Sequence, residues 1–304
     1  DFVGKFAELS DIISSAKFIY LLLIVVLLMP VNWGIEAWKW KYLIKKSEHV
    51  PFPTSMKAIY AGISISSLSP NRVGEFFGRV FVLKETSFWR GVIMTVLGSY
   101  AQTLVTLFFG LNAMVFFLFP YVMDKDYVSE SQFYFIYGIV LFGLAIVFLS
   151  FLWIAKFKFL WNRLKPKYRV AFTVLNDYKP FEMFNVFLFS VLRYFIFSLQ
   201  YFLLLKALQI EIDFFNGMGL ISLIFFFNTV RPSIALLEVA VRYMIAYEVF
   251  MLFYTYGNQD IYFTEAQIGL ASSTLWLINI VIPALLGLLF VKEMKFVKNK
   301  QNGK

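Results

Sequence analysis

Three long runs without a charged residue constrain this chain more than any other feature. Gly91–Phe119, Phe133–Ala155 and Ala266–Val291 contain no Asp, Glu, Lys or Arg over 29, 23 and 26 positions. About 20 apolar residues of α-helix cross a hydrocarbon core about 30 Å thick, so each run is long enough to span a membrane. Because backbone groups in lipid must bond within their own segment, we predict an all-α, polytopic integral membrane protein.

The composition of the chain agrees with that prediction. Of the 304 residues, 60% are hydrophobic and 15% are charged, whereas a soluble domain carries about 25% charged residues. No stretch between the apolar runs could hold a soluble domain, so we expect one membrane domain over residues 1–304. The chain has no cysteine, and its single histidine, His49, lies in a polar segment. We therefore expect no metal site and no cofactor.

The net charge of +9 is distributed unevenly along the chain. Four segments, 36–57, 72–90, 156–180 and 292–304, hold 21 of the 28 Lys and Arg residues. Such clustering is typical of cytoplasmic loops, which face anionic lipids. We therefore expect a multi-pass protein of the cell (inner) membrane, with these loops and the C-terminal tail in the cytoplasm. Its expected partners are membrane phospholipids, with other membrane subunits as an open alternative, and the distribution of charge argues against nucleic acid.

Residues 58–84 predict a re-entrant hairpin rather than a membrane span. Ala58–Asn71 is an apolar piece of 14 residues, which makes about 21 Å of helix and is too short to cross. The piece is rich in small residues, which let helices approach closely in lipid. It stops at Pro70, because proline ends the hydrogen-bond ladder. We expect Ala58–Lys84 to enter and leave the membrane on the cytoplasmic side.

A second proline break resembles the first. In both, a Glu follows the proline by five or six residues, and an Arg follows the Glu by four. The first set is Pro70, Glu75 and Arg79, and the second is Pro232, Glu238 and Arg242. We predict an inverted-topology repeat of residues 18–119 and 181–291 around the connector 120–180, which points to a transport site near the midplane. The charge pattern leaves open whether 214–256 crosses fully or forms a second hairpin.

Seven charged residues near these breaks are the candidate substrate-binding side chains. They are Arg72, Glu75, Arg79, Arg193, Arg231, Glu238 and Arg242. A charge deep in lipid costs at least about 2.5–3.5 kcal/mol by insertion scales, but a Glu and an Arg four residues apart can neutralise each other. Each pair can hold its broken helix together as a structural ion pair. The Arg residues, with Arg72 and Arg231, can also receive an anionic headgroup while the Glu residues orient them, since the planar fork of Arg suits phosphate, and the two roles are compatible. The unpaired Arg193, in mid-span, must face the interior, and we expect it to line the same cavity.

Other polar residues in the apolar runs are expected to have structural roles. We expect interhelical hydrogen bonds from Asn32, Glu36, Gln102 and Gln200. The first span, Phe18–Ile35, is expected to end at the interface in the run Trp38–Lys41. The sequence has no phosphate-binding Gly-rich loop and no Gly-Lys-Ser/Thr motif, which argues against ATP hydrolysis.

The two breaks resemble those of the lysylphosphatidylglycerol synthase transmembrane family, also called flippase-like proteins. Its members carry Pro-x-x-x-Gly-Glu with a downstream Arg, and a second element with Pro, Glu and Arg. The matching residues are Pro70, Gly74, Glu75 and Arg79 in the first element and Pro232, Glu238 and Arg242 in the second. Where the family has a Gly-rich approach to the second Glu, this chain has Ile234–Leu237.

The resemblance implies a membrane domain that binds or moves polar lipids. Bifunctional members add a soluble aminoacyl-transfer domain after the membrane part, whereas only Lys292–Lys304 follows the last apolar run here. We therefore expect a flippase or transporter of an anionic or aminoacylated phospholipid-like substrate, bound in a cavity between two broken helices, and not an enzyme. Two alternatives stay open. One is an intramembrane enzyme acting on lipid or polyprenyl phosphate through Glu75 or Glu238, and the other is a non-catalytic subunit of a membrane complex.

Overall fold

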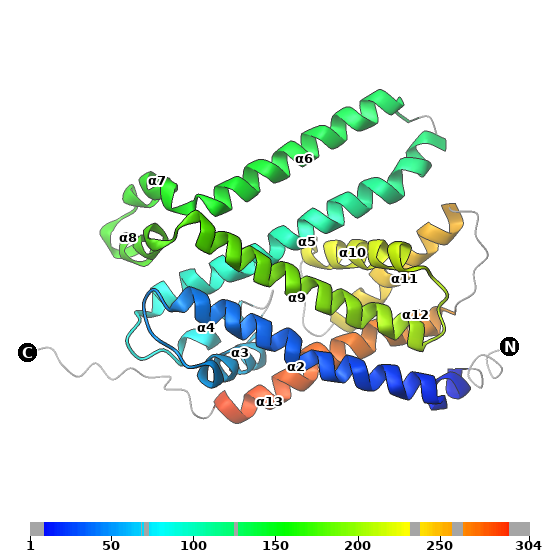
Figure 1. Cartoon of the computed structure of the whole chain (residues 1–304), viewed down its shortest axis with the longest axis horizontal. Coiled ribbons are helices and arrows are strands. Elements are labelled where there is room, and N and C mark those ends of the chain that lie inside the picture. The colour runs from blue at the N-terminus through cyan, green and yellow to red at the C-terminus, as the bar shows by residue number, and fades with distance from the viewer. Residues whose placement is uncertain are drawn as a thin grey trace, which may run out of the picture.

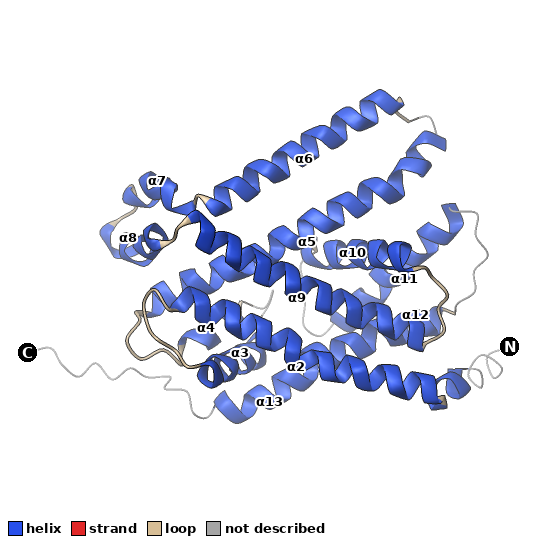
Figure 2. Cartoon of the chain, in the orientation of Figure 1, coloured by secondary structure: helices blue, strands red, loops and turns tan. Residues whose placement is uncertain are grey.

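The computed structural model describes residues 9–67, 69, 73–124, 127–231, 238–256 and 264–291. Regular structure in these ranges is entirely helical (Figure 2). The longer helices are α2 (Ala16–Ile44), α5 (Phe88–Asp124), α6 (Glu130–Leu152), α9 (Pro180–Ala207), α10 (Phe214–Val230) and α11 (Glu238–Tyr256). The last span combines α12 (Glu265–Trp276), a π-helical turn, η5 (Leu277–Val281), and α13 (Ile282–Val291). The shorter elements are α3 (Phe52–Ser66), α4 (Gly74–Val80), η2 (Ile154–Phe157), α7 (Lys158–Asn162), α8 (Pro166–Phe172) and η3 (Thr173–Asp177).

Five described helices are long and apolar enough to cross a membrane. They are Ala16–Ile44, Phe88–Phe117, Glu130–Leu152, Pro180–Ala207 and Glu265–Val291. The prediction of an all-α, polytopic membrane protein is confirmed. The apolar runs located these helices because uninterrupted hydrophobic sequence is what a lipid-embedded helix requires.

Helices α2 and α9 form the centre of the bundle and run antiparallel along each other (Figure 1). At one end the Nζ of Lys46 lies 2.7 Å from Oε1 of Glu182. Towards the other end, Nε2 of Gln200 donates to the carbonyl of Val25 at 2.8 Å. Gln200 therefore makes the interhelical bond that its type and position suggested.

The segment predicted as a hairpin consists of two short helices, α3 and α4, packed against each other, and α3 also packs against α13 (Figure 1). A Cβ added to Gly78 of α4 would lie 2.8 Å from Cα of Gly62 in α3. A Cβ on Gly287 of α13 would overlap the carbonyl of Tyr60 in α3. Glycine at these positions lets the three backbones touch, as small residues do in membrane helices. The break at Pro70 lies outside the described residues, and entry and exit on one side of the membrane stays a prediction.

Helix α2 corrects one expectation about the interface. The first span does not end at Ile35 but continues as one helix to Ile44. Of the run expected at the interface, Trp38 is 52% exposed, but Lys39 and Trp40 are each only 1% exposed. Buried partners explain the difference, since Trp40 donates from Nε1 to Thr95 at 2.9 Å and Lys39 pairs with an acidic residue. A basic, aromatic sequence run therefore did not mark the helix end.

Helix α6 is apolar on all sides and forms an arm with α5 that extends away from the centre of the bundle (Figure 1). Among its residues only Phe151, near the C-terminal end, is buried. An apolar helix exposed in this way suits contact with lipid chains rather than with water. The arm continues into η2, α7, α8 and η3, the segment expected at the membrane interface. There, Trp161 packs at 6.4 Å from Phe172.

Candidate functional site

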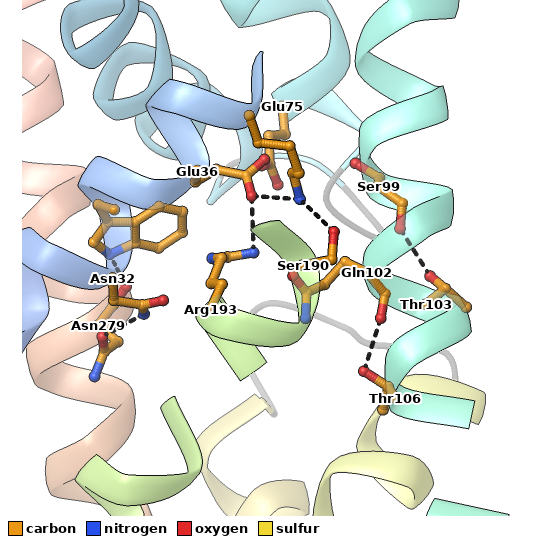
Figure 3. A network of polar contacts seen from close by, with 12 residues as sticks. Asn32, Glu36, Glu75, Ser99, Gln102, Thr103, Thr106, Ser190, Arg193 and Asn279 are labelled. Carbon is orange, nitrogen blue, oxygen red and sulfur yellow. Dashed lines mark hydrogen bonds and ion pairs between the residues drawn. The ribbon is translucent and has the colours of Figure 1, made fainter. Parts of the chain in front are cut away.

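The centre of the bundle contains a buried charge cluster built around Glu36 of α2 (Figure 3). Its Oε2 lies 2.7 Å from Nζ of Lys39 and 3.2 Å from Nη1 of Arg193, a residue of α9. Its Oε1 accepts from Nη1 of Arg79, on α4, at 2.8 Å. Three cationic side chains from three helices therefore converge on one carboxylate. We call Glu36, Lys39, Glu75, Arg79 and Arg193 the Glu36 cluster.

Arg79 connects two carboxylates within the cluster. While Nη1 donates to Glu36, Nη2 pairs with Glu75 one turn earlier in α4. The guanidinium fork suits this task because it presents several donors in fixed directions. Close packing of α3 and α4 makes the arrangement possible, since a Cβ on Gly62 would lie 2.9 Å from Cγ of Arg79. The small residue in α3 thus leaves the space that the Arg79 side chain occupies.

Arg193 is held by a ring as well as by a carboxylate. Its guanidinium carbon lies 4.6 Å from the ring centroid of Trp33, a cation–π geometry. The indole Nε1 of Trp33 donates to the backbone carbonyl of Asn279 at 3.1 Å. That carbonyl is available because Pro283, four residues later, has no N–H to donate. Asn279 also accepts at Oδ1 from Nδ2 of Asn32 at 3.1 Å (Figure 3). The π-helical turn in the last span therefore positions the ring on which Arg193 rests.

The cluster lies deep in the bundle. Arg193 follows the first residue of α9 by thirteen positions, which is about 20 Å along the helix axis. Glu36, Lys39 and Arg79 are no more than 2% exposed, whereas Arg193 and Glu75 are 19% and 17% exposed. Burying ions at this depth costs several kcal/mol per ion unless partners compensate. The cluster meets that requirement with ion pairs, and its two more accessible members have opposite charges.

The balance of charge within the cluster favours anions. Its five members carry three positive and two negative charges. Lys39 also donates to Oγ of Ser190 at 3.3 Å, so one of the three cations is bonded to a neutral group as well. Arginine binds phosphate and carboxylate oxygens through paired donors. The arrangement can therefore bind an anionic group at the accessible guanidinium of Arg193.

The model of the lysylphosphatidylglycerol synthase TM region family matches residues 2–176. The chain belongs to this family. No curated protein and no solved structure matches it. The matched residues include four members of the cluster, Glu36, Lys39, Glu75 and Arg79, while Arg193 lies beyond them. Membership confirms the predicted resemblance, and with the five apolar helices it supports a multi-pass membrane protein with a function related to membrane lipids.

The second predicted Glu–Arg pair, Glu238 and Arg242, lies in α11. Nη2 and Nε of Arg242 are 2.7 Å and 3.0 Å from Oε1 of Glu238. Arg242 is 20% exposed and Glu238 is 11% exposed. The two residues therefore form the ion pair that their spacing suggests.

The seven predicted site residues thus divide into groups. The structure brings Glu75, Arg79 and Arg193 together, and it pairs Glu238 with Arg242 in α11. Arg231 is exposed at the C-terminal end of α10. Arg72 lies outside the described residues. Among the residues that the structure describes, no group of three His, Asp or Glu side chains is arranged to hold a metal ion.

Sequence reasoning missed two members of the cluster and the partner of a third. Glu36 was expected as a hydrogen-bonding residue and Lys39 as an interfacial one, yet both are buried ions. Arg193, expected to be unpaired, binds Glu36. One signal could have found the first two, because Asn32, Glu36 and Lys39 are spaced by four and three residues and so share one helix face. No such local signal links Glu36 to Arg193, since the two lie on different helices.

Proposed function

We propose that this protein binds the anionic headgroup of a phospholipid-like molecule at the Glu36 cluster and moves that molecule across the bilayer. The observation that carries the proposal is the convergence of Lys39, Arg79 and Arg193 on a single carboxylate deep in the bundle. Family membership supports lipid as the class of ligand.

In this proposal the headgroup phosphate binds the guanidinium of Arg193. Arg193 is the most accessible cation of the cluster, and its planar donors fit phosphate oxygens. Lys39 and Arg79 keep their bonds to Glu36 and hold the site together. An aminoacylated headgroup would also bring an ammonium group, for which Glu75, 17% exposed, is the nearest accessible carboxylate of the cluster.

Movement is proposed to depend on the α3–α4 hairpin and on the break predicted at Pro232, between α10 and α11, which lies outside the described residues. Broken helices in corresponding halves of a transporter commonly form the substrate site near the midplane. The α3–α4 hairpin supplies Glu75 and Arg79 to the cluster. Re-entry of this hairpin and the inverted repeat are therefore parts of the proposed mechanism.

The enzyme alternative has less support from the geometry. An acid or base for lipid chemistry would need a carboxylate that is free of arginine, so that its protonation could change. Both carboxylates considered for that role, Glu75 and Glu238, are ion-paired with an arginine of the same helix. We therefore propose binding and movement rather than catalysis.

Substitution of Arg193 tests the proposal. Arg193→Gln should abolish binding of an anionic phospholipid, and Arg193→Lys should weaken it about 10-fold, because a point charge cannot replace the paired donors of Arg. Binding is measured from the lipid-induced rise in melting temperature in detergent, and movement from the loss of a labelled lipid from one leaflet of reconstituted vesicles. Arg163→Gln is the matched control, since Arg163 is exposed in the interfacial segment. Equal binding and movement by all three variants would refute the proposal.

A further inference from the structure

Gln102 of α5 has a buried side-chain oxygen that no described residue binds. The residue was expected to bond between helices, as Gln200 does. Its Oε1, however, accepts no hydrogen bond from any residue that the structure describes. Buried polar atoms in proteins are nearly always hydrogen-bonded, and leaving one unsatisfied is costly. The position of this amide beside the Glu36 cluster suggests what it binds.

Two contacts of α5 show which way Gln102 faces. Gly98 lies one turn earlier on the same helix face, and a Cβ added there would lie 3.7 Å from Cε of Lys39 in α2. Phe109 lies two turns later on that face, and its ring stacks on Tyr194 of α9 with 4.9 Å between the centroids. Gln102 therefore belongs to the face of α5 that packs against α2 and α9.

Gln102 also lies at the depth of Arg193 in the bundle. Helices α5 and α9 run in the same direction (Figure 1). Lys39 approaches Gly98 of α5 and bonds to Ser190 of α9 at 3.3 Å, so these two positions lie side by side. Four residues further along α5 comes Gln102, and three further along α9 comes Arg193, which are rises of about 6 Å and 4.5 Å. Figure 3 accordingly shows the side chain of Gln102 pointing towards Ser190 and Arg193.

The amide of Gln102 offers chemistry that the charged members of the cluster do not. Arg193 and Lys39 only donate hydrogen bonds, and the carboxylate of Glu75 favours a cation. A primary amide has a neutral acceptor oxygen and can accept from a hydroxyl as well as from an ammonium group. The side chain of Gln102 is half-buried, as those of Arg193 and Glu75 are, so a ligand at the accessible side of the cluster can reach it.

We infer that Gln102 is a specificity-determining residue, whose amide oxygen accepts a hydrogen bond from a hydroxyl or ammonium group of the headgroup when the phosphate is bound at Arg193. The inference rests on the proposed function and adds a preference for headgroups that carry a hydrogen-bond donor. Such a headgroup satisfies the buried oxygen of Gln102. A headgroup without a donor leaves the oxygen unsatisfied and therefore binds more weakly.

Two pairs of lipids test this preference in the unchanged protein. Phosphatidylglycerol carries headgroup hydroxyls and phosphatidylmethanol carries none, although both are anionic. Phosphatidylethanolamine carries an ammonium group with N–H donors, which phosphatidylcholine replaces with methyl groups. We expect the donor-bearing lipid to bind about 5-fold more tightly than its counterpart, as measured from the lipid-induced rise in melting temperature in detergent. A preference in the first pair only would identify a hydroxyl as the donor, and in the second pair only an ammonium group.

Substitution of Gln102 tests whether this residue causes the preference. Gln102→Met keeps the length of the side chain and removes the amide, so it should abolish the preference. The lipid without a donor should still bind within about 2-fold of its original affinity, because Arg193 is intact. Thr103→Val, one residue later and on another side of α5, is the matched control. The hydroxyl of Thr103 bonds within its own helix to the carbonyl of Ser99 at 3.2 Å, so its removal should leave the preference unchanged.

The results separate the role of Gln102 from the proposed function. Equal affinities within both lipid pairs, or a preference that persists in Gln102→Met, would overturn the inferred role and leave the proposed function intact. Lipid binding that Arg193→Gln does not weaken would overturn both. The comparison of lipids on the unchanged protein needs no substitution, so it decides against the inference even if Gln102→Met does not fold.

Discussion

The two Glu–Arg pairs have the same four-residue spacing and different surroundings. In α4, Arg79 is 2% exposed and binds Glu36 of α2 in addition to Glu75. In α11, Arg242 is 20% exposed, and its ion pair with Glu238 lies within the helix. The spacing predicts a pair in both places because residues four apart face the same way. Whether a pair also joins helices depends on which helix packs beside it, and the spacing says nothing about that.

The largest expected difference between the two predicted repeats, residues 18–119 and 181–291, is the side of the membrane from which the broken segment of each repeat enters. If the regions are inverted repeats, the segments before α3 and α10 lie on opposite sides of the membrane. Single cysteines at His49 and Glu211, introduced into this cysteine-free chain, should therefore react with an impermeant thiol reagent from opposite sides. The test is all-or-none in intact vesicles. Reaction of both from the same side would break the inverted relation.

The second largest expected difference is the loss of stability when the Glu and the Arg of one pair are exchanged. Glu75→Arg with Arg79→Glu would put a carboxylate beside the buried Glu36, and leaving buried charges unpaired costs about 3–5 kcal/mol. Glu238→Arg with Arg242→Glu keeps a neutral pair in a more exposed place and should cost about 1 kcal/mol. The melting temperature in detergent measures both. Equal losses would show that the two pairs have the same structural role.

Disturbing the close backbone contact between α3 and α4 should have a smaller effect on stability. Gly78→Ala places a Cβ 2.8 Å from Cα of Gly62, and overpacking of this kind costs about 1–3 kcal/mol. Gly138→Ala in α6 is the matched control, since nothing lies within 4 Å of the added Cβ. It should stabilise its helix by roughly 0.5–1 kcal/mol. If the alanine at position 78 were as harmless as that at 138, the backbone contact of α3 with α4 would not matter for stability.

The smallest expected effect is a pH dependence of stability that arises from Glu48. The carboxylate of Glu48, after α2, accepts backbone N–H groups of Lys84, Glu85 and Thr86 at 2.9 Å each. Partial burial raises the pKa of Glu48, but these three bonds outweigh it and hold the pKa below its ordinary value of 4.5. A lowered pKa means that the stabilisation is present above about pH 4.5 and is lost as the pH falls through the lowered pKa.

Because Glu48 is only partly buried, solvent screening limits this contribution to less than about 1 kcal/mol. Melting temperatures measured between pH 7 and pH 3 should fall slightly less for Glu48→Gln than for the unchanged protein, since the amide does not titrate. Glu130→Gln, at an exposed position in the first turn of α6, serves as the control. Identical pH profiles for the unchanged protein and Glu48→Gln would show that the carboxylate does not hold the loop.

Much of the fold could be predicted from the sequence. The three charge-free runs located α5, α6 and the last span to within five residues, whereas the first predicted span, Phe18–Ile35, ended nine residues before α2 does. The short apolar piece before Pro70 correctly indicated a separate short helix, α3. These successes share a cause: in lipid, length and hydrophobicity are local properties that decide whether a helix can span.

What the sequence alone determined is therefore the class of protein, the positions of its helices and the pairing of charges four residues apart. Only the tertiary structure decided that Glu36 binds Arg79, 43 residues away, and Arg193, on another helix. The reason is physical. Helical periodicity fixes which side chains share a face, but which faces meet depends on the packing of whole helices, and here on glycine contacts that bring α4 against α3.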